Sequence, residues 1–193
     1  MSVVRPAHAV GKFATAAIFV AAGIQVLIAV MLWSSANEAS GVLVDWAALF
    51  VQVVAGVAFV VWMSQARLNS DVITSKHQHR YANMWVFVGW IIPFLNLFIP
   101  FVVMQDIWRG SDRSQPMVGL KQRPQSGLVT AWWLCYLASN ALVLIAGNSA
   151  VQDYATVYTL SAVMSVAAAS LAARMIKRVN AMQEEVPSHL GES

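Results

Sequence analysis

The sequence predicts an all-α integral membrane protein with four transmembrane helices and a proline-broken re-entrant hairpin between helices two and three. Three observations support this fold class. The chain is 59% hydrophobic and only 11% charged, whereas about a quarter of the residues of a soluble domain are charged. Four apolar runs are long enough to cross a hydrocarbon layer about 30 Å thick. A fifth apolar run contains Pro93, Asn96 and Pro100 at its centre.

The four predicted spans form a single transmembrane domain over residues 1–185, and they cover residues 13–33, 42–63, 128–146 and 154–173. The first run exceeds the apolar core of a secretory signal, about 7–15 residues, so we interpret it as a permanent anchor. The third contains the only cysteine, which excludes an intrachain disulfide. After the fourth span we expect one or two more helical turns, and then a flexible cytoplasmic tail over residues 186–193.

Three uncharged amide side chains fall within the predicted spans, namely Gln25, Gln52 and Asn140. Such groups form hydrogen bonds between membrane helices that are worth about 1 kcal/mol each. We therefore expect these three side chains to join neighbouring helices.

The positions of the basic residues distinguish a crossing segment from a re-entrant one. All twelve lysines and arginines fall into groups of two, three, four and three, placed before the first span, after the second, after the proline-broken run and after the fourth. If all five runs crossed, the basic residues would be divided five against seven. If the run over about residues 84–108 enters and returns, all twelve lie on one side, as the cytoplasmic preference of basic residues requires. This topology places both termini in the cytoplasm.

The residues of the fifth run also favour a hairpin. Each proline removes a helical hydrogen bond and clashes with the preceding turn, and the residues before them, Ile92 and Ile99, are pushed away from helical angles. Asn96 is suited to cap a second half-helix that begins at residue 97. The alternative is a full span with proline kinks, which membrane helices tolerate when neighbours satisfy the freed backbone groups.

The block from residue 62 to residue 111 has a recurring pattern of tryptophan, arginine, proline and asparagine. Its members are Trp62, Arg67, Asn69, Arg80, Tyr81, Trp85, Trp90, Pro93, Asn96, Leu97, Pro100, Asp106, Ile107, Trp108, Arg109 and Ser111. This pattern resembles the bacterial, mostly actinobacterial membrane family catalogued as domain of unknown function 4328. The resemblance implies a small multi-span protein of the bacterial cytoplasmic membrane, and it implies no activity. The connection from Ser70 to His79 is longer than in the family pattern.

The sequence contains few candidates for catalysis or metal binding. His77 and His79, with Asp71 nearby, are weak candidate metal ligands, and a metal site would need further ligands that the neighbouring sequence lacks. We therefore predict no metal, no cofactor and no catalytic residue. A nucleophile elbow and a phosphate-binding glycine loop are also missing from the sequence. The weakest of our alternatives is an enzyme that acts on lipid headgroups through Asp71, His77 and His79.

The candidate functional residues lie in the hairpin and in the cytoplasmic loop before it. Those of the hairpin are Trp90, Pro93, Asn96, Pro100, Asp106, Trp108 and Arg109, and those of the loop are Arg67, Asn69, Arg80 and Tyr81. Arg67 and Arg109 are expected to pair with Asp106 or to bind the carbonyl groups of the hairpin. For Lys121 and Arg123 we expect no role beyond orienting the chain.

These observations predict a non-enzymatic membrane scaffold or accessory subunit. Its hairpin and basic loops would engage membrane lipids, including anionic headgroups, or a partner that is a second copy or another membrane protein. The net charge of +3 is explained by membrane orientation, so we expect no nucleic acid partner. The alternative is a small oligomeric channel or transporter whose pathway the hairpin lines. Polar residues converging on Asn96 would favour the channel, and apolar packing there would favour the scaffold.

Overall fold

The computed structural model of the protein describes residues 7–34, 42–74, 78–114, 118–148 and 152–184. Within these ranges the regular elements are helices, and none is a strand. Four helices are long and apolar enough to cross a membrane, namely α1 (His8–Trp33), α2 (Val42–Thr74), α6 (Gly127–Ala146) and α7 (Tyr154–Glu184). The predicted all-α, multi-pass membrane fold is confirmed.

Two of the four helices extend well past their predicted ends. The spans were expected to finish at residues 63 and 173, whereas α2 continues to Thr74 and α7 to Glu184. Each extension adds about three helical turns, more than the one or two expected after the fourth span. The two extensions lie at the same end of the bundle, where Asn69 of α2 is hydrogen-bonded to Gln183 of α7. The predicted tail, 186–193, falls outside the described residues.

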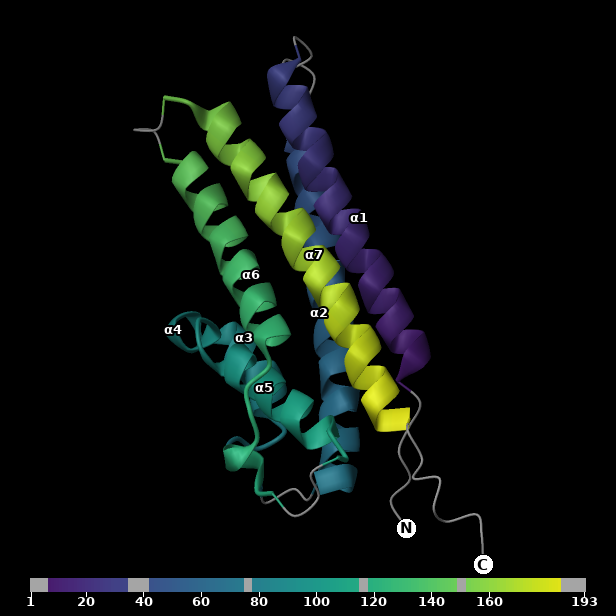
Figure 1. The fold of residues 1–193 in the computed structure, drawn as a ribbon. Coiled ribbons are helices and arrows are strands. Elements are labelled where there is room, and N and C mark those ends of the chain that lie inside the picture. The colour runs from purple at the N-terminus through teal and green to yellow at the C-terminus, as the bar shows by residue number, and fades with distance from the viewer. Residues whose placement is uncertain (1–6, 35–41, 75–77, 115–117, 149–151, 185–193) are drawn as a thin grey trace, which may run out of the picture.

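The four long helices are arranged in the spatial order α2, α1, α7, α6 (Figure 1). α1 packs against both α2 and α7, and α7 packs against α6. Within the described part of the chain, α2 and α6 do not pack against each other along their length, although the rings of Phe59 and Trp132 lie 5.2 Å apart where the hairpin joins the bundle. The bundle is therefore open between these two helices.

Most of the apolar surface of the long helices faces outward. Only 17–28% of the residues in their most apolar windows are buried inside the protein, and large side chains such as Phe50, Leu27 and Leu144 are exposed. A water-soluble monomer rarely exposes apolar patches of this extent. Surrounding lipid accounts for the pattern, because it solvates apolar side chains while the helices satisfy their own backbone groups.

Between α2 and α6 the chain forms three short helices, α3 (Trp85–Ile91), α4 (Pro93–Asn96) and α5 (Ile99–Ser111). α3 and α5 pack against each other, and α4 forms the tip at the edge of the bundle (Figure 1). A side chain at Gly89 would collide with Ile99, since its Cβ would lie 2.6 Å from Ile99 Cγ2. Glycine therefore permits the close approach of α3 and α5. We call residues 85–111 the hairpin.

The breaks within the hairpin correspond to the two prolines. Ile92 is extended, with ψ of 116°, and Pro93 begins α4. The second break falls at Phe98 and not at Ile99 as predicted, because α5 begins at Ile99. Pro100 is therefore in the first helical turn. Backbone N–H groups there have no hydrogen-bond acceptor within the helix, so a proline removes no helical bond.

The predicted capping role of Asn96 is wrong. Asn96 ends α4, and the turn formed by Leu97 and Phe98 separates it from the start of α5. The first residues of α5 receive no hydrogen bond from a capping side chain. The Oδ1 atom of Asn96 is buried and has no hydrogen-bond partner.

The core of the protein lies at the end of the bundle where the hairpin joins it. The largest fully buried apolar side chains there are Trp62, Met63, Met104, Ile107 and Met175. They come from α2, α5 and α7, so the hairpin contributes directly to the core. The loop from α5 to α6 contains a short 3-10 helix, η3 (Leu120–Gln122), and covers the same end of the bundle.

Candidate functional site

The candidate site is a group of buried and partly buried polar and charged side chains at the hairpin end of the bundle, with Arg80 at its exposed edge. Its members come from the extension of α2, from the loop over residues 78–84 and from α5, and we call them the polar cluster: Arg67, Ser70, Asp71, His79, Arg80, Asn83, Asp106 and Arg109. Burying charged groups is unfavourable unless each is paired or hydrogen-bonded. The partners of each group therefore determine how this region is held together.

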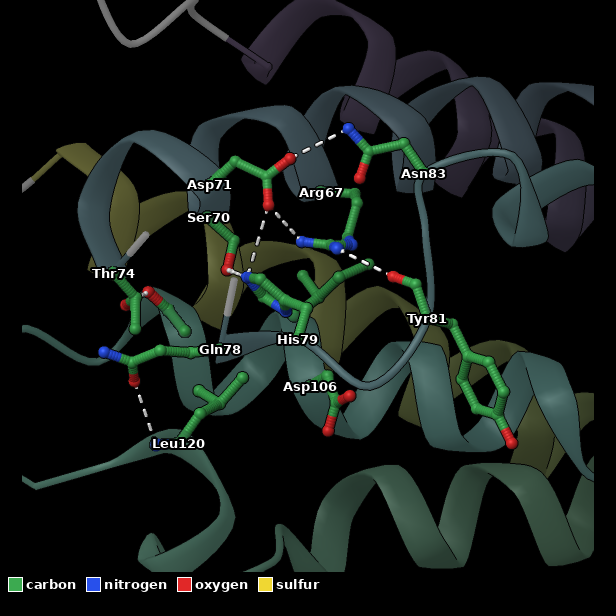
Figure 2. Close-up of polar contacts among 12 residues, drawn as sticks. Arg67, Ser70, Asp71, Thr74, Gln78, His79, Tyr81, Asn83, Asp106 and Leu120 are labelled. Carbon is green, nitrogen blue, oxygen red and sulfur yellow. Dashed lines mark hydrogen bonds and ion pairs between the residues drawn. The ribbon is translucent and has the colours of Figure 1, made fainter. Parts of the chain in front are cut away.

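Arg67 and Asp71 connect the end of α2 to the loop before the hairpin (Figure 2). The Arg67 guanidinium forms an ion pair with Asp71 one helical turn later, and its Nη2 donates to the Tyr81 carbonyl oxygen at 3.0 Å. The second carboxylate oxygen of Asp71 accepts a hydrogen bond from Asn83 Nδ2 at 2.8 Å. These bonds fix the chain immediately before α3.

His79 is packed between α2 and α5 with its side chain only 1% exposed. Its Nε2 lies 3.2 Å from Ser70 Oγ and 3.5 Å from Asp71 Oδ1. Burial, reinforced by the charge of Arg67, lowers the pKa of His79 to about 4. His79 is therefore neutral at physiological pH.

We expect the protein to lose stability as pH falls from about 6.5 to about 4. The unfolded chain binds a proton at this position below pH 6.5, whereas folded His79 does not until about pH 4. Thermal unfolding in detergent at a series of pH values measures this effect, and His79→Gln is expected to flatten the profile. Removing the neighbouring charge with Arg67→Met should raise the His79 pKa, as followed by NMR. A His79 titration midpoint near pH 6.5 in the wild-type protein would contradict the burial of this side chain.

Asp106 is the negative centre of the second half of the cluster. Its Oδ2 accepts from the Arg80 backbone N–H at 3.1 Å, and its Oδ1 lies 3.4 Å from Arg80 Nε and 3.9 Å from Arg109 Nη1. Burial raises the pKa of Asp106, while the bond from the Arg80 backbone and the charges of Arg80 and Arg109 oppose that shift. The expected pairing of Arg109 with Asp106 is found. Arg67 instead pairs with Asp71.

A second set of bonds attaches α5 to the start of α6. Gln105 forms two hydrogen bonds with the Ser126 backbone. Its Nε2 donates to the carbonyl oxygen at 3.0 Å, and its Oε1 accepts from the N–H at 2.9 Å. Arg123 is buried, and its Nη1 donates to the carbonyl oxygens of Arg109 and Asp112 at 2.6 and 2.8 Å. The prediction that Arg123 only orients the chain is therefore wrong, because it binds the carbonyl groups at the end of α5.

The extension of α7 supplies a third set of bonds that the sequence did not predict. Gln183 Nε2 donates to the Ala66 carbonyl oxygen and to Ser111 Oγ, both at 2.8 Å, while its Oε1 accepts from Asn69 at 3.0 Å. One glutamine thus joins α2, α5 and α7. The sequence feature that could have predicted the burial of Gln183 is the apolar residues near it at helical spacing, since they indicate a buried helix face beyond residue 173.

The remaining sequence candidates divide between two places. Trp108 is partly buried against the core, and the Tyr81 ring lies 5.8 Å from the ring of Trp85. Trp90, Pro93, Asn96 and Pro100 belong to α3, α4 and the first turn of α5, away from the polar cluster. The candidate residues therefore fall into two separate groups, the polar cluster and the apolar tip of the hairpin.

Ser70, His79 and Asp71 have the residue types of a hydrolase triad, but their geometry differs from one. In a triad the serine and the aspartate contact opposite ring nitrogens of the histidine, whereas here both lie against Nε2. His79 Nδ1 is buried without a partner, and Ser70 is fully buried. This arrangement does not present an activated nucleophile to a substrate.

The described residues also contain no group of three His, Cys, Asp or Glu side chains arranged to hold a metal ion. The carboxylate of Asp71 is already engaged by Arg67 and Asn83. His77 lies outside the described residues.

Residues 31–183 match the family described as Domain of unknown function (DUF4328). The chain belongs to the DUF4328 family. The matched region contains the four candidate spans except for most of α1, and it contains the entire hairpin and polar cluster. No curated protein and no solved structure matches the chain. The arrangement of the DUF4328 region is therefore interpreted from its own contacts.

Proposed function

We propose that this DUF4328 protein is a non-enzymatic scaffold or accessory subunit of the bacterial cytoplasmic membrane, with both termini in the cytoplasm. The proposal rests on one observation. The polar cluster and the Thr74–Gly110 hydrogen bond hold both ends of the hairpin to α2 and to the loop before α3, while the tip exposes large apolar side chains. Phe94 is 82% exposed, Ile91 76% and Phe98 66%. A rigidly anchored apolar tip is suited to contact lipid or a partner, because exposed patches of this kind mark interaction surfaces.

The position of the tip along α6 supports a hairpin that enters the bilayer. Trp133 Nε1 donates to the Leu97 carbonyl oxygen at 3.2 Å, and the Trp90 ring lies 6.0 Å from the rings of both Trp133 and Tyr136. Trp133 and Tyr136 lie about 9–14 Å from the start of α6 at 1.5 Å per residue. We infer that residues 85–111 enter from the cytoplasmic side, reach this depth and return to the same side.

The surface charge at the hairpin end supports contact with anionic lipid. The exposed basic residues described there are Lys12, Arg80, Lys121, Arg174, Lys177 and Arg178. Each lysine or arginine near an anionic membrane surface contributes about 1 kcal/mol to attraction. Glu184 is the exposed acidic side chain at the end of α7, and it is hydrogen-bonded to His8. The balance is positive, as on a cytoplasmic face.

Single cysteines test the topology directly. In a Cys135→Ser background, we expect Ser34→Cys and Asn148→Cys to react with a membrane-impermeant thiol reagent in intact cells. Ser114→Cys should react only after the membrane is opened, because it follows the hairpin on the cytoplasmic side. Labelling of Ser114→Cys in intact cells would show that the proline-broken segment crosses, and the proposal would fail. Wild-type thermal stability of each variant serves as the control for folding.

The same experiment addresses the channel alternative through Asn96→Cys. A water-filled pathway along the hairpin would make this position reactive, whereas an apolar tip in lipid leaves it protected from both sides. The described neighbours of Asn96 in the chain are the apolar Phe94, Leu95, Leu97 and Phe98. This surrounding favours the scaffold over the channel.

A further inference from the structure

The opening between α2 and α6 forms a cavity of about 800 Å³. Its walls are formed by α2 and α6, and its floor by α1 and α7. Residues of all these helices line it, among them Gly56, Val60, Tyr136 and Ala169. A volume of this size lies within the range of sites that bind small molecules, about 300–1,000 Å³. We call this cavity the lateral slot.

The lining of the lateral slot is apolar and uncharged. None of the described residues that line it carries a charge, and its few polar groups include Gln52, Asn140 and Ser165. The expectation that Asn140 joins two helices is wrong, because its amide donates to the Tyr136 carbonyl oxygen of its own helix. A cavity without charged groups is suited to a hydrocarbon ligand and poorly suited to an ion.

Small residues make the slot accessible from the bilayer. A Cβ atom added at Gly56 would have no other atom within 4 Å, so the wall of α2 is unfilled at this point. On the floor, α7 contributes Ala168, Ala169 and Ala172. These alanines are almost fully buried, so the open part of the surface lies on α2 around Gly56.

One end of the slot is closed by the hairpin. Phe87, Trp90 and Ile91 of α3 line it there. On α6, the lining residues run from Trp132 to Asn140, which places the slot about 8–20 Å from the start of that helix. The slot therefore lies around the middle of α6 and extends past the midplane of a hydrocarbon layer about 30 Å thick. It does not continue through the hairpin end as a pore, because α3 lines it there.

We propose that the lateral slot holds an acyl chain of a phospholipid from the leaflet at the hairpin end. The phospholipid headgroup would lie at the basic surface that includes Arg80, whose side chain is 34% exposed. Negative phosphate and positive surface are complementary. This inference goes beyond the proposed function, because it concerns the slot and not the tip of the hairpin.

Photocrosslinking tests this assignment. The protein is placed in vesicles that contain phosphatidylglycerol with a diazirine near the end of one acyl chain, and adducts are located by mass spectrometry after illumination. We expect adducts to concentrate on the parts of α2, α6 and α7 that line the slot. Gly56→Leu fills the open space and should reduce these adducts several-fold.

Gly23→Leu is the matched control, because Gly23 also has no atom within 4 Å of an added Cβ and lies in α1 outside the slot. It should leave the adducts at the slot unchanged. Adducts spread evenly over all exposed helix faces, or equal labelling in Gly56→Leu and wild type, would overturn the inference. So would protein–protein crosslinks at the slot in place of lipid adducts, since they would indicate a second copy. A phosphatidylcholine probe with the same acyl chain distinguishes lipid binding in the slot from the preference for anionic lipid. Equal labelling of the slot by both probes would support lipid binding there and would contradict the preference for anionic headgroups.

Discussion

Replacing Asp106 with alanine is expected to destabilise the protein by about 3–5 kcal/mol, the range observed when one partner of a buried ion pair is removed. The substitution leaves the guanidinium of Arg109 buried without its counter-charge and removes the acceptor of the Arg80 backbone N–H. The loss would fall on the connection between α5 and the loop before α3. Thermal and chemical unfolding in detergent measure it.

Two further variants make this prediction specific. Asp106→Asn preserves shape and one acceptor, so we expect a smaller loss than for alanine. Asp45→Ala is the matched control, because Asp45 is an exposed aspartate in the first turn of α2 at the opposite end of the bundle, and its removal should cost less than about 1 kcal/mol. Equal effects of Asp106→Ala and Asp45→Ala would mean that the buried cluster contributes no more to stability than a surface charge. Limited proteolysis of the 112–126 connection should increase in Asp106→Ala, since α5 would separate from the loop before α3.

Replacing Gly110 with alanine is expected to destabilise the protein by about 1–3 kcal/mol through overpacking. The added Cβ would overlap Ser70 Oγ and lie 3.0 Å from His79 Cε1. Relief requires α5 to move away from α2, and that movement would also stretch the 2.6 Å hydrogen bond from Thr74 Oγ1 to the Gly110 carbonyl oxygen. Leucine at this position should have a larger effect than alanine.

Gly119→Ala is the control for this variant, because the space around Gly119 is open and its φ of −58° suits any residue. Removing the Ser70 hydroxyl relieves the overlap, so the double variant Ser70→Ala with Gly110→Ala should lose less stability than the sum of the two single variants. Strict additivity would mean that the two positions do not touch. A neutral Gly110→Ala would contradict the close packing of α5 on α2.

The sequence predicted the hairpin residues well where the cause is local. Pro93 begins α4 after the extended Ile92, because a proline restricts its own backbone and that of its predecessor. The same reasoning placed the second break one residue too late, and it assigned Asn96 a cap that the Leu97–Phe98 turn prevents. The length of a turn depends on how α3 and α5 pack, which no single residue specifies.

The polar cluster was predicted only in part. Arg67, Arg80, Asp106 and Arg109 were identified because charged residues recur in the family pattern near membrane ends. Gln183 was not predicted, and Arg123 was given no role beyond orienting the chain. Both are buried and hydrogen-bonded at the hairpin end of the bundle. An uncharged amide beyond a span, and an arginine in a basic loop, look the same in sequence whether they are solvated or buried.

The sequence by itself determined the four membrane helices, the interruption at Pro93 and the basic end of the molecule, since each depends on composition within one continuous segment. Only the tertiary structure decided that α2 and α7 continue beyond the apolar runs, that Gln183 reaches Asn69 and Ser111, and that α2 and α6 leave a slot between them. These features arise between residues far apart in the chain. Their partners are set by which helix faces meet, and a polar side chain can be buried only where another helix supplies its hydrogen bonds.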